Sequence, residues 1–454
     1  MIKYIDFILN KLLRYRQSIG LSFFFFGGPL MYFLRDGIKL APGSTAFTGA
    51  LTFGSILLAF PLNPKKLYQT NTVGYLMCIA YTILAIFYLA FFTPNRGWFT
   101  NTTVEAIYQG LIILSMFIFA ATSINTIKDT FLQFTLIICL IGGFGLIYYI
   151  FKNPLYVIGM RASISFSGDD EVSAMGNPHI YAKSAFSGVV AGVILLRQEK
   201  RIIHRLFYIG SVFVLLVVLA LCQAMAIILV TGIFFFLYYI SSFTSNNIYK
   251  GLKWATGWQG LLLLAFMCFS VYYIIEQTRF PEYFEHISVL ITERIERIVT
   301  SLTDAKTATS VTLAGDDSAS TRVTNITDLF KDIDKRIDDG DWLSVIFGKG
   351  FQQKYIDSPF FQTLNDLGIM GFAFFAIIHV VLIMWCGKEI FKPTCGFTLF
   401  IAYTFIATVV QNFTMGMPYD YPRWTAMLFV ARFALDYKKV IIKRPAVVRS
   451  TVSA

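Results

Sequence analysis

The sequence predicts an all-α polytopic membrane protein with about 12 transmembrane helices and one large helical extracytoplasmic loop. Three observations support this fold class. The 454 residues are 56% hydrophobic and only 14% charged, with a mean hydropathy of +0.63, whereas soluble domains usually carry about 25% charged residues. Apolar stretches of the roughly 20 residues that cross a bilayer recur along the chain. Basic residues gather in alternate connections between them. The composition therefore excludes an ordinary water-soluble enzyme.

The predicted membrane spans follow one another with mostly short connections. They lie near residues 18–34, 43–60, 72–93, 103–123, 130–151, 180–197, 206–221, 223–240, 259–276, 367–386, 394–414 and 421–437. The first follows a basic segment, as a signal peptide does, but no small-residue cleavage site follows it, so we expect an uncleaved helix. The seventh and eighth are expected to form a hairpin that turns at Leu221–Ala224, and the last is interrupted by Arg423 and Arg432.

The distribution of Lys and Arg predicts the orientation of these spans. With the N-terminus inside, the cytoplasmic segments hold 20 basic residues and the short outer connections hold 6. This asymmetry favours a cytoplasmic position for both termini and an even number of spans. The net charge of +11 therefore indicates membrane topology and not nucleic-acid binding. The same rule accounts for the basic inner loop Arg197–Arg205, since no glycine-rich phosphate-binding motif follows a strand anywhere in the sequence.

The cysteines and histidines form no recognisable disulfide or metal-binding pattern. The predicted extracytoplasmic loops contain no pair of cysteines, so no disulfide framework is expected. The four histidines show no HExxH motif or other close spacing of ligands. We therefore predict neither a metal site nor a cofactor.

Two outer loops are longer than the rest and organise the chain. The first, about 152–179, belongs to an N-terminal bundle of about nine spans over residues 1–276. The second occupies 277–367 and precedes the C-terminal helices and basic cytoplasmic tail, 368–454; it holds 10 basic and 15 acidic residues. Long loops with their own composition are usually functional or separately structured. The alternative is a loop that only packs over the outer helix ends.

Inside the large loop, the apolar periodicity predicts two helices. The first covers residues 284–302. The second starts near Ser320, runs to Asp339 and ends at Gly340. A short apolar run that contains a glycine turn follows, from Trp342 to Phe351.

Short motifs occur in a recognisable order around this loop. They are Gly159-Met-Arg161, Met175-Gly-Asn177-Pro178-His179-Ile-Tyr-Ala182, Ser320-Thr-Arg322, Phe347-Gly348-Lys-Gly350 and Asp357-Ser-Pro-Phe-Phe-Gln-Thr-Leu364-Asn-Asp366-Leu-Gly368-Ile-Met-Gly371. Their order resembles the O-antigen polymerase and O-antigen ligase superfamily. Its members share a "GR…NPN…A" segment, an Arg at the start of the loop helix, a "G.G" turn and an "HN..L..L.E.G" segment. The resemblance covers roughly residues 155–390.

The resemblance implies a GT-C-like glycosyltransferase of the bacterial inner membrane. Such enzymes transfer a glycan from undecaprenyl diphosphate to a sugar hydroxyl on the periplasmic face, without a metal and with inversion at the anomeric carbon. Here Asp357 stands at the family's His position and His179 at the third position of "NPN". The missing His favours a polymerase of O-antigen or exopolysaccharide repeat units over a ligase that transfers finished glycan to lipid A–core.

The polymerase hypothesis also implies partners. These are undecaprenyl-diphosphate-linked glycans, membrane lipids and a chain-length-regulating co-polymerase, with no nucleic acid. The alternative from another class is a 12-span transporter or flippase. Transporters usually consist of two related halves, whereas only the second half of this chain contains a large outer loop.

Three residues are candidates for the catalytic chemistry. Arginine binds diphosphate bidentately and stays charged, so Arg161 and Arg322 are expected to clamp the leaving diphosphate. Asp357 is expected to act as the base for the attacking hydroxyl. Alternatively, Arg161 anchors to lipid phosphates, Arg322 pairs with Asp316, Asp317 or Asp328, and Asp357 caps the next helix. Asp366, further along that helix, is expected to be a structural or gating group.

Five further residues are expected to bind the substrate. Asn177, His179 and Lys183 stand at the outer start of a span, where His179 and Lys183 share one helix face because they are four residues apart. A lysine at this place can bind diphosphate or extend to the membrane interface. Tyr421 and Arg423 belong to an outer turn, which either forms an aromatic belt with a charged anchor or stacks on a sugar.

Overall fold

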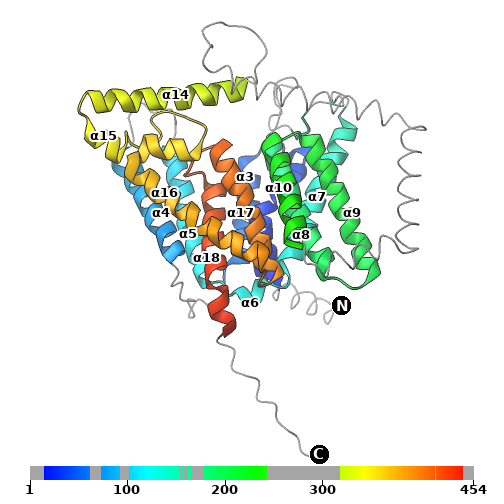
Figure 1. Cartoon of the computed structure of the whole chain (residues 1–454). Helices are drawn as coiled ribbons and strands as arrows, with labels where there is room; N and C mark the ends of the chain where they lie inside the picture. Colours follow the sequence, from blue (N-terminus) through cyan, green and yellow to red (C-terminus); the bar gives the residue numbers. More distant parts are fainter. Residues whose placement is uncertain are drawn as a thin grey trace, which may run out of the picture.

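The structure, a computed structural model, describes residues 15–61, 73–92, 102–153, 156, 161–164, 177–242, 317–414 and 416–442. All the regular elements in these ranges are helices (Figure 1). Seven of the described helices are long and apolar enough to cross a membrane, or up to eight if a bent pair near the N-terminus counts as one span. The described part of the chain is therefore an all-α polytopic membrane protein, as its composition predicts.

The helices can be followed along the chain in Figure 1. The N-terminal ones are Tyr15–Phe26, α2 (Gly28–Tyr32), the π-helical turn η1 (Phe33–Gly37), α3 (Thr45–Ala59), α4 (Val73–Phe91), α5 (Thr102–Ala121), α6 (Ile124–Ile127) and α7 (Phe131–Lys152). The others are α8 (Pro178–Gln198), α9 (Ile202–Cys222), α10 (Met225–Ser242), α14 (Asp317–Asp338), α15 (Trp342–Phe347), α16 (Pro359–Phe391), α17 (Gly396–Thr414) and α18 (Tyr421–Ile442).

Two predictions about individual spans have different outcomes. The predicted hairpin is confirmed, because α9 ends at Gln223 in a left-handed conformation and α10 follows directly. The first predicted span, 18–34, is instead broken: Tyr15–Phe26 and Gly28–Gly37 meet at an angle of 76°. Pro29 accounts for the break, since it has no N–H to donate to the preceding turn and its ring clashes with a continuous helix.

Other predicted spans match shorter or more polar helices. The helices α3, α5 and α18 occupy predicted positions, but they are not among the seven long apolar helices. The reason for α18 is its charged residues, which are the buried Arg423 and Arg432 and, closer to its end, Asp436, Lys438 and Lys439. The predicted span at 259–276 and the predicted loop helix at 284–302 lie outside the described residues.

The helix α16 starts before the membrane span that hydropathy predicts near residue 367. It begins at Pro359, close to the helix start that a cap at Asp357 would give. Proline is favoured in the first helical turn because no N–H partner is needed there. Gly368 then interrupts the helix with a φ of 67°, and a β-carbon at this position would lie 2.3 Å from the carbonyl oxygen of Ile346 in α15. The close packing of α15 therefore requires a glycine at the bend.

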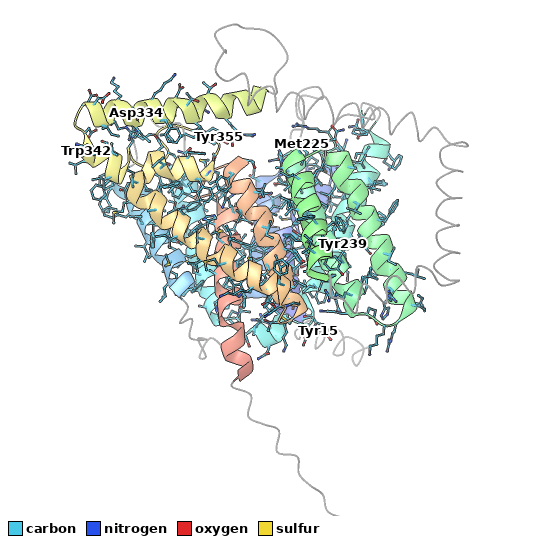
Figure 2. All side chains as sticks on the ribbon, in the orientation of Figure 1. Tyr15, Met225, Tyr239, Asp334, Trp342 and Tyr355 are labelled. Carbon is cyan, nitrogen blue, oxygen red and sulfur yellow. The ribbon has the colours of Figure 1, made fainter. Side chains whose placement is uncertain are left out.

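The amphipathic helix α14 lies across one end of the bundle, which we call the α14 end (Figure 1). Its bounds agree with the predicted loop helix, and Gly340 follows it with a positive φ, as expected. The helix α15 then leads to the predicted glycine turn, with Gly348 at φ 81° and Gly350 at φ 108°. Tyr355 lies beneath α14, while Trp342 lies at the far edge of the molecule (Figure 2).

The packing of the core determines where the helix ends lie. The helix α8 is the most buried of the seven long apolar helices. Beside it, the ring of Phe131 packs against Phe397 and Phe429 at centroid distances of 5.4 and 5.6 Å. The indole of Trp424 donates a hydrogen bond of 2.7 Å to Thr82. Close packing of this kind resists displacement, and the hydrogen bond of Trp424 holds the first turn of α18 against α4.

Candidate functional site

The carboxylate of Asp357 connects three separate segments at the α14 end. Its Oδ2 accepts a hydrogen bond of 2.6 Å from Arg322 Nε in α14. Its Oδ1 accepts from the hydroxyl of Tyr355 at 2.5 Å and from the backbone N–H of Gly416 at 2.7 Å. Asp357 has a φ of 57°, which is uncommon for residues other than glycine. The surrounding contacts maintain this strained backbone, a feature that is frequent at functional sites.

These contacts bear on the alternatives for Arg322 and Asp357. Arg322 contacts Asp357, while Asp328 lies 3.5 Å from Lys354. Asp316 and the side chain of Asp317, the other aspartates considered as partners of Arg322, lie outside the described part of the chain. Asp357 does not cap α16, because Ser358 is the residue before that helix and the carboxylate of Asp357 accepts from other elements. Asp357 therefore has a tertiary role.

The start of α8 adds the next residues to the cluster. Asn177 caps this helix, since its Oδ1 accepts from the backbone N–H of His179 at 3.0 Å. His179 interacts electrostatically with Arg161, Arg322 and Asp357, and its Nδ1 has no hydrogen-bond partner among the described residues. The structure thus brings Arg161, His179, Arg322 and Asp357 together, whereas Asn177 acts through the backbone that positions His179.

Arg161 belongs to a short segment that is held by the helical hairpin. The adjacent Ala162 donates its backbone N–H to the carbonyl of Leu221 at 2.9 Å. Arg161 itself is exposed, and Ala162 is completely buried. The charged side chain therefore projects from a fixed point of attachment.

Lys183, one turn along α8 from His179, faces a second group of charges. It interacts electrostatically with Arg423 and Asp420. Burial raises the pKa of the Asp420 carboxyl above its usual value, and the positive charges of Arg423 and Lys183 oppose this effect. Asp420 nevertheless retains exposed surface and Lys183 is half-buried.

Arg423 lies between the two groups of charges. It interacts electrostatically with Asp357 on one side and with Asp420 on the other, and only 7% of its surface is exposed. Its guanidinium packs against Gly416, where a β-carbon would lie 2.7 Å from Arg423 Nη1. Gly416 also has a φ of 81°. This glycine therefore serves both sides of the site, because its N–H donates to Asp357 and its missing side chain admits Arg423.

Tyr421, another predicted substrate-binding residue, lies within an aromatic group. Its ring makes an edge contact with Phe24 at 5.6 Å and stacks with Tyr108 at 6.2 Å between centroids. Its hydroxyl has no hydrogen-bond partner among the described residues. The ring therefore contributes packing.

Asp366 has a structural role. It is completely buried, and its carboxylate accepts from the backbone N–H of Gln352 at 3.0 Å and from the side-chain amides of Gln362 and Asn365 at 2.9 Å. The carbonyl of Asp366 also accepts from the N–H of Gly350 at 3.1 Å. Asp366 thus holds the glycine turn against α16.

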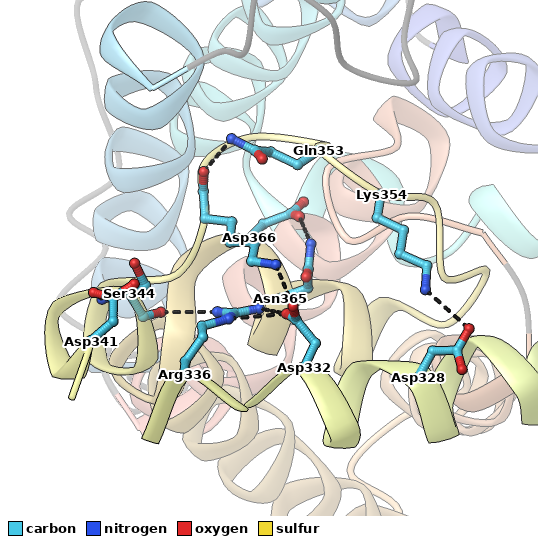
Figure 3. A network of polar contacts seen from close by, with 10 residues as sticks. Asp328, Asp332, Arg336, Asp341, Ser344, Gln353, Lys354, Asn365 and Asp366 are labelled. Atoms are coloured by element: carbon cyan, nitrogen blue, oxygen red, sulfur yellow. Dashed lines mark hydrogen bonds and ion pairs between the residues drawn. The ribbon is translucent and has the colours of Figure 1, made fainter. Parts of the chain in front are cut away.

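A further network attaches α14 to this turn (Figure 3). Asp332 accepts hydrogen bonds from Arg336 in the next helical turn and from Lys349 in the glycine turn, the latter at 2.6 Å. Arg336 also donates to the carbonyl of Ser344 at 3.2 Å, and Asp341 caps α15 by accepting from the N–H of Ser344. The network fixes the position of α14, and therefore that of Arg322.

Three residues near the site were not predicted from the sequence. Tyr355 donates to Asp357, and burial together with this hydrogen bond raises the pKa of its hydroxyl, which therefore remains a donor. Glu105, at the start of α5, interacts with the side chain of Gln352 and electrostatically with Asp420. Gln352 has a positive φ of 51°. These residues lie in no common local pattern, and only the nearby Asp357 motif could have drawn attention to Tyr355.

The described residues contain no group of three or more His, Cys, Asp or Glu side chains that could hold a metal ion. One internal gap, between Tyr81, Gln109 and Trp424, leaves no room for a water molecule. No known protein family matches the chain, and neither does any curated protein. Fold and geometry thus define a multi-pass helical membrane protein with a cluster of charged residues at the α14 end.

Proposed function

We propose that the protein is a glycosyltransferase of the bacterial inner membrane. It polymerises undecaprenyl-diphosphate-linked oligosaccharide repeat units into O-antigen or exopolysaccharide. The observation that carries this proposal is the grouping of Arg161, His179 and Arg322 around Asp357 at the α14 end. In this proposal the α14 end faces the periplasm, the chain crosses the membrane about 12 times, and both termini are cytoplasmic.

The cationic cluster suits a reaction in which a diphosphate departs. Negative charge accumulates on the phosphate oxygens as the glycosidic bond to the donor breaks, and preorganised cations stabilise it. Arginine is well matched to phosphate because its planar guanidinium donates two parallel hydrogen bonds. With Arg161 and Arg322 in this role the transfer is independent of a metal, and attack from the opposite face of the sugar inverts the anomeric carbon.

Asp357 orients Arg322 for this task. The contact uses Arg322 Nε, so the Nη atoms of the guanidinium are the donors offered to phosphate. The side chain of Arg322 is 29% exposed, which keeps it accessible from the periplasm. Asp357 thus acts as a positioning residue for the cation, and its three hydrogen-bond donors keep it in place.

The lipid part of the substrate requires an apolar surface close to the site. Phe91 at the end of α4 and the next residue, Phe92, are exposed, and so are Leu343 and Phe347 of α15. The two helices are joined because the hydroxyl of Tyr88 donates to the carbonyl of Phe347 at 2.7 Å. An exposed apolar surface of this kind suits membrane lipid and a polyprenyl chain.

The direct test is reconstitution of the reaction. The full-length protein in proteoliposomes, incubated with undecaprenyl-diphosphate-linked repeat units, is expected to produce a ladder of polymer lengths. The double variant Arg161→Ala/Arg322→Ala should insert normally and produce no ladder. Transfer of preformed chains only to lipid A–core would instead identify a ligase. Movement of the lipid-linked glycan without a new glycosidic bond would identify a transporter.

A further inference from the structure

A second group of polar side chains lies next to the cationic cluster and has no part in the mechanism above. It consists of Glu105 from α5, Gln352 after the glycine turn and Asp420 before α18. Glu105 interacts with the Gln352 side chain and electrostatically with Asp420. The neighbouring rings show the same arrangement, since Phe351 stacks on Tyr419 at 4.6 Å and Tyr108 stacks on Tyr421 at 6.2 Å between centroids. Three elements that are distant in sequence therefore bring two carboxylates and an amide together.

Gln352 shows that this group is not a completed structural network. Only 3% of its surface is exposed, yet its side-chain Oε1 has no hydrogen-bond partner among the described residues. Its left-handed backbone is held by the hydrogen bond from its N–H to Asp366. A buried acceptor without a donor is costly. A ligand hydroxyl is a donor of the required kind.

Asp420 is the member of the group that a ligand can reach. It is exposed, whereas Glu105 is half-buried. Lys183 and Arg423 interact with it electrostatically, which places it at the border of the cationic cluster. Its backbone carbonyl accepts from the N–H groups of Arg423 and Trp424 at 3.0 and 2.9 Å, so the main chain begins α18 while the carboxylate faces other elements.

Asp357 is poorly suited to accept a proton from a substrate hydroxyl. Both of its oxygens already accept hydrogen bonds, from Arg322, Tyr355 and Gly416. Protonation of this carboxylate would weaken the contact with Arg322 at the moment when that cation is needed. The proton acceptor must therefore be sought beside the cationic cluster.

We infer that Glu105, Gln352 and Asp420 form the subsite for the acceptor sugar, and that Asp420 accepts the proton of the attacking hydroxyl. This inference rests on the proposed function. The hydroxyl oxygen forms a bond to the anomeric carbon of the donor. The bond from that carbon to the diphosphate oxygen breaks, and its electron pair leaves with undecaprenyl diphosphate. The hydroxyl proton passes to the carboxylate of Asp420.

The test separates proton transfer from donor binding. Initial rates are measured for the purified full-length protein with lipid-linked repeat units, and binding of undecaprenyl diphosphate is measured separately. Asp420→Asn is expected to lower kcat about 100-fold or more with unchanged binding of undecaprenyl diphosphate. Asparagine caps a helix as well as aspartate does, so α18 should remain intact. Asp420→Glu, which retains a carboxylate, should recover part of the rate.

One further variant tests the acceptor subsite, and a second serves as its control. Glu105→Gln should raise the KM for the acceptor roughly tenfold, as expected for the loss of one charged hydrogen bond. Asp328→Asn is the matched control, because this exposed carboxylate of α14 lies at the same end of the molecule and contacts Lys354. It should retain full activity.

The outcomes distinguish the inference from the proposed function. If the wild-type protein polymerises and Asp420→Asn retains its kcat, the inference is wrong and the proposed function stands. The inference is also wrong if Asp420→Asn loses donor binding in proportion to its rate. If the wild-type protein forms no glycosidic bond with any lipid-linked glycan, both are wrong.

Discussion

Asp357 and Asp366 lie on the same segment of the chain, yet their surroundings are opposite. Asp366 is completely buried and receives its side-chain hydrogen bonds from neutral amides. Asp357 keeps 19% of its side chain exposed and receives hydrogen bonds from an arginine, a tyrosine and a distant backbone N–H. A carboxylate whose hydrogen-bond donors come from nearby residues stabilises a local turn. A carboxylate that joins distant segments of the chain to an arginine positions that arginine within a site.

The largest effect is expected from removing the cation beside Asp357. Arg322→Ala should lower the rate of polymerisation about 100- to 1000-fold, since one preorganised group that stabilises developing charge contributes about 3–4 kcal/mol. Thermal unfolding should remain unchanged. The matched control is Lys354→Ala, a cation of the same surface that contacts Asp328 and should retain its activity. A normal rate for Arg322→Ala would remove this arginine from the mechanism.

A stability effect of comparable size is expected at Asp366. Asp366→Ala leaves three buried donors without an acceptor and should destabilise the protein by about 3 kcal/mol. The measurement is thermal unfolding in detergent, where this variant should unfold earlier than the wild type and Asp357→Asn should not. If Asp366→Ala has normal stability but no activity, Asp366 acts in the reaction and its structural role is wrong.

A smaller effect is expected at Tyr355, which holds Asp357 from the other side. Tyr355→Phe removes one hydrogen bond to a charged group and should raise the KM for the lipid-linked donor roughly tenfold, about 1.4 kcal/mol. The value of kcat should change little, because Asp357 retains its contacts with Arg322 and Gly416. A large fall in kcat with normal KM would instead assign Tyr355 to the chemical step.

The smallest effect concerns the attachment of α14. Burial raises the pKa of the Asp332 carboxyl, but hydrogen bonds from Lys349 and Arg336 outweigh it and lower the pKa below its usual value. A carboxyl group whose pKa is lowered on folding stabilises the folded state at pH values above its unfolded pKa of about 3.9. This stabilisation is lost as the pH falls through the pKa of the folded state. Asp332 is 36% exposed, so solvent screening limits this to less than about 1 kcal/mol.

Limited proteolysis of α14 measures this attachment. Cleavage should accelerate below about pH 4 in the wild-type protein. Asp332→Asn should be cleaved faster at neutral pH and show little further change on acidification. A cleavage rate independent of pH in the wild-type protein would indicate that the other contacts of α14 hold it without Asp332.

Much of the fold could be predicted because its signals are local. Apolar stretches predict the positions of helices such as α7 and α8, and periodicity with a terminal glycine predicts α14 and its end at Gly340. The break at Pro29 was missed, because proline outweighs hydropathy there and a run of apolar residues does not register that conflict. Hydropathy also placed the start of the third-to-last span near residue 367, whereas the Asp-Ser-Pro motif indicated the earlier helix start that α16 has at Pro359.

The candidate site required the tertiary structure, because its contacts join residues that no short pattern links. Arg322 and Asp357 are 35 positions apart, Asp357 and Gly416 are 59 apart, and Tyr88 and Phe347 are 259 apart. The sequence by itself determined the membrane fold, the helix of the large loop and the motifs that carry Arg161, Arg322 and Asp357. Only the packing of α8, α14 and the α17–α18 turn decided that Asp357 joins Arg322. The physical reason is that hydropathy and helix signals act over a few turns, whereas ion pairs form between whichever charges the packed helices bring together.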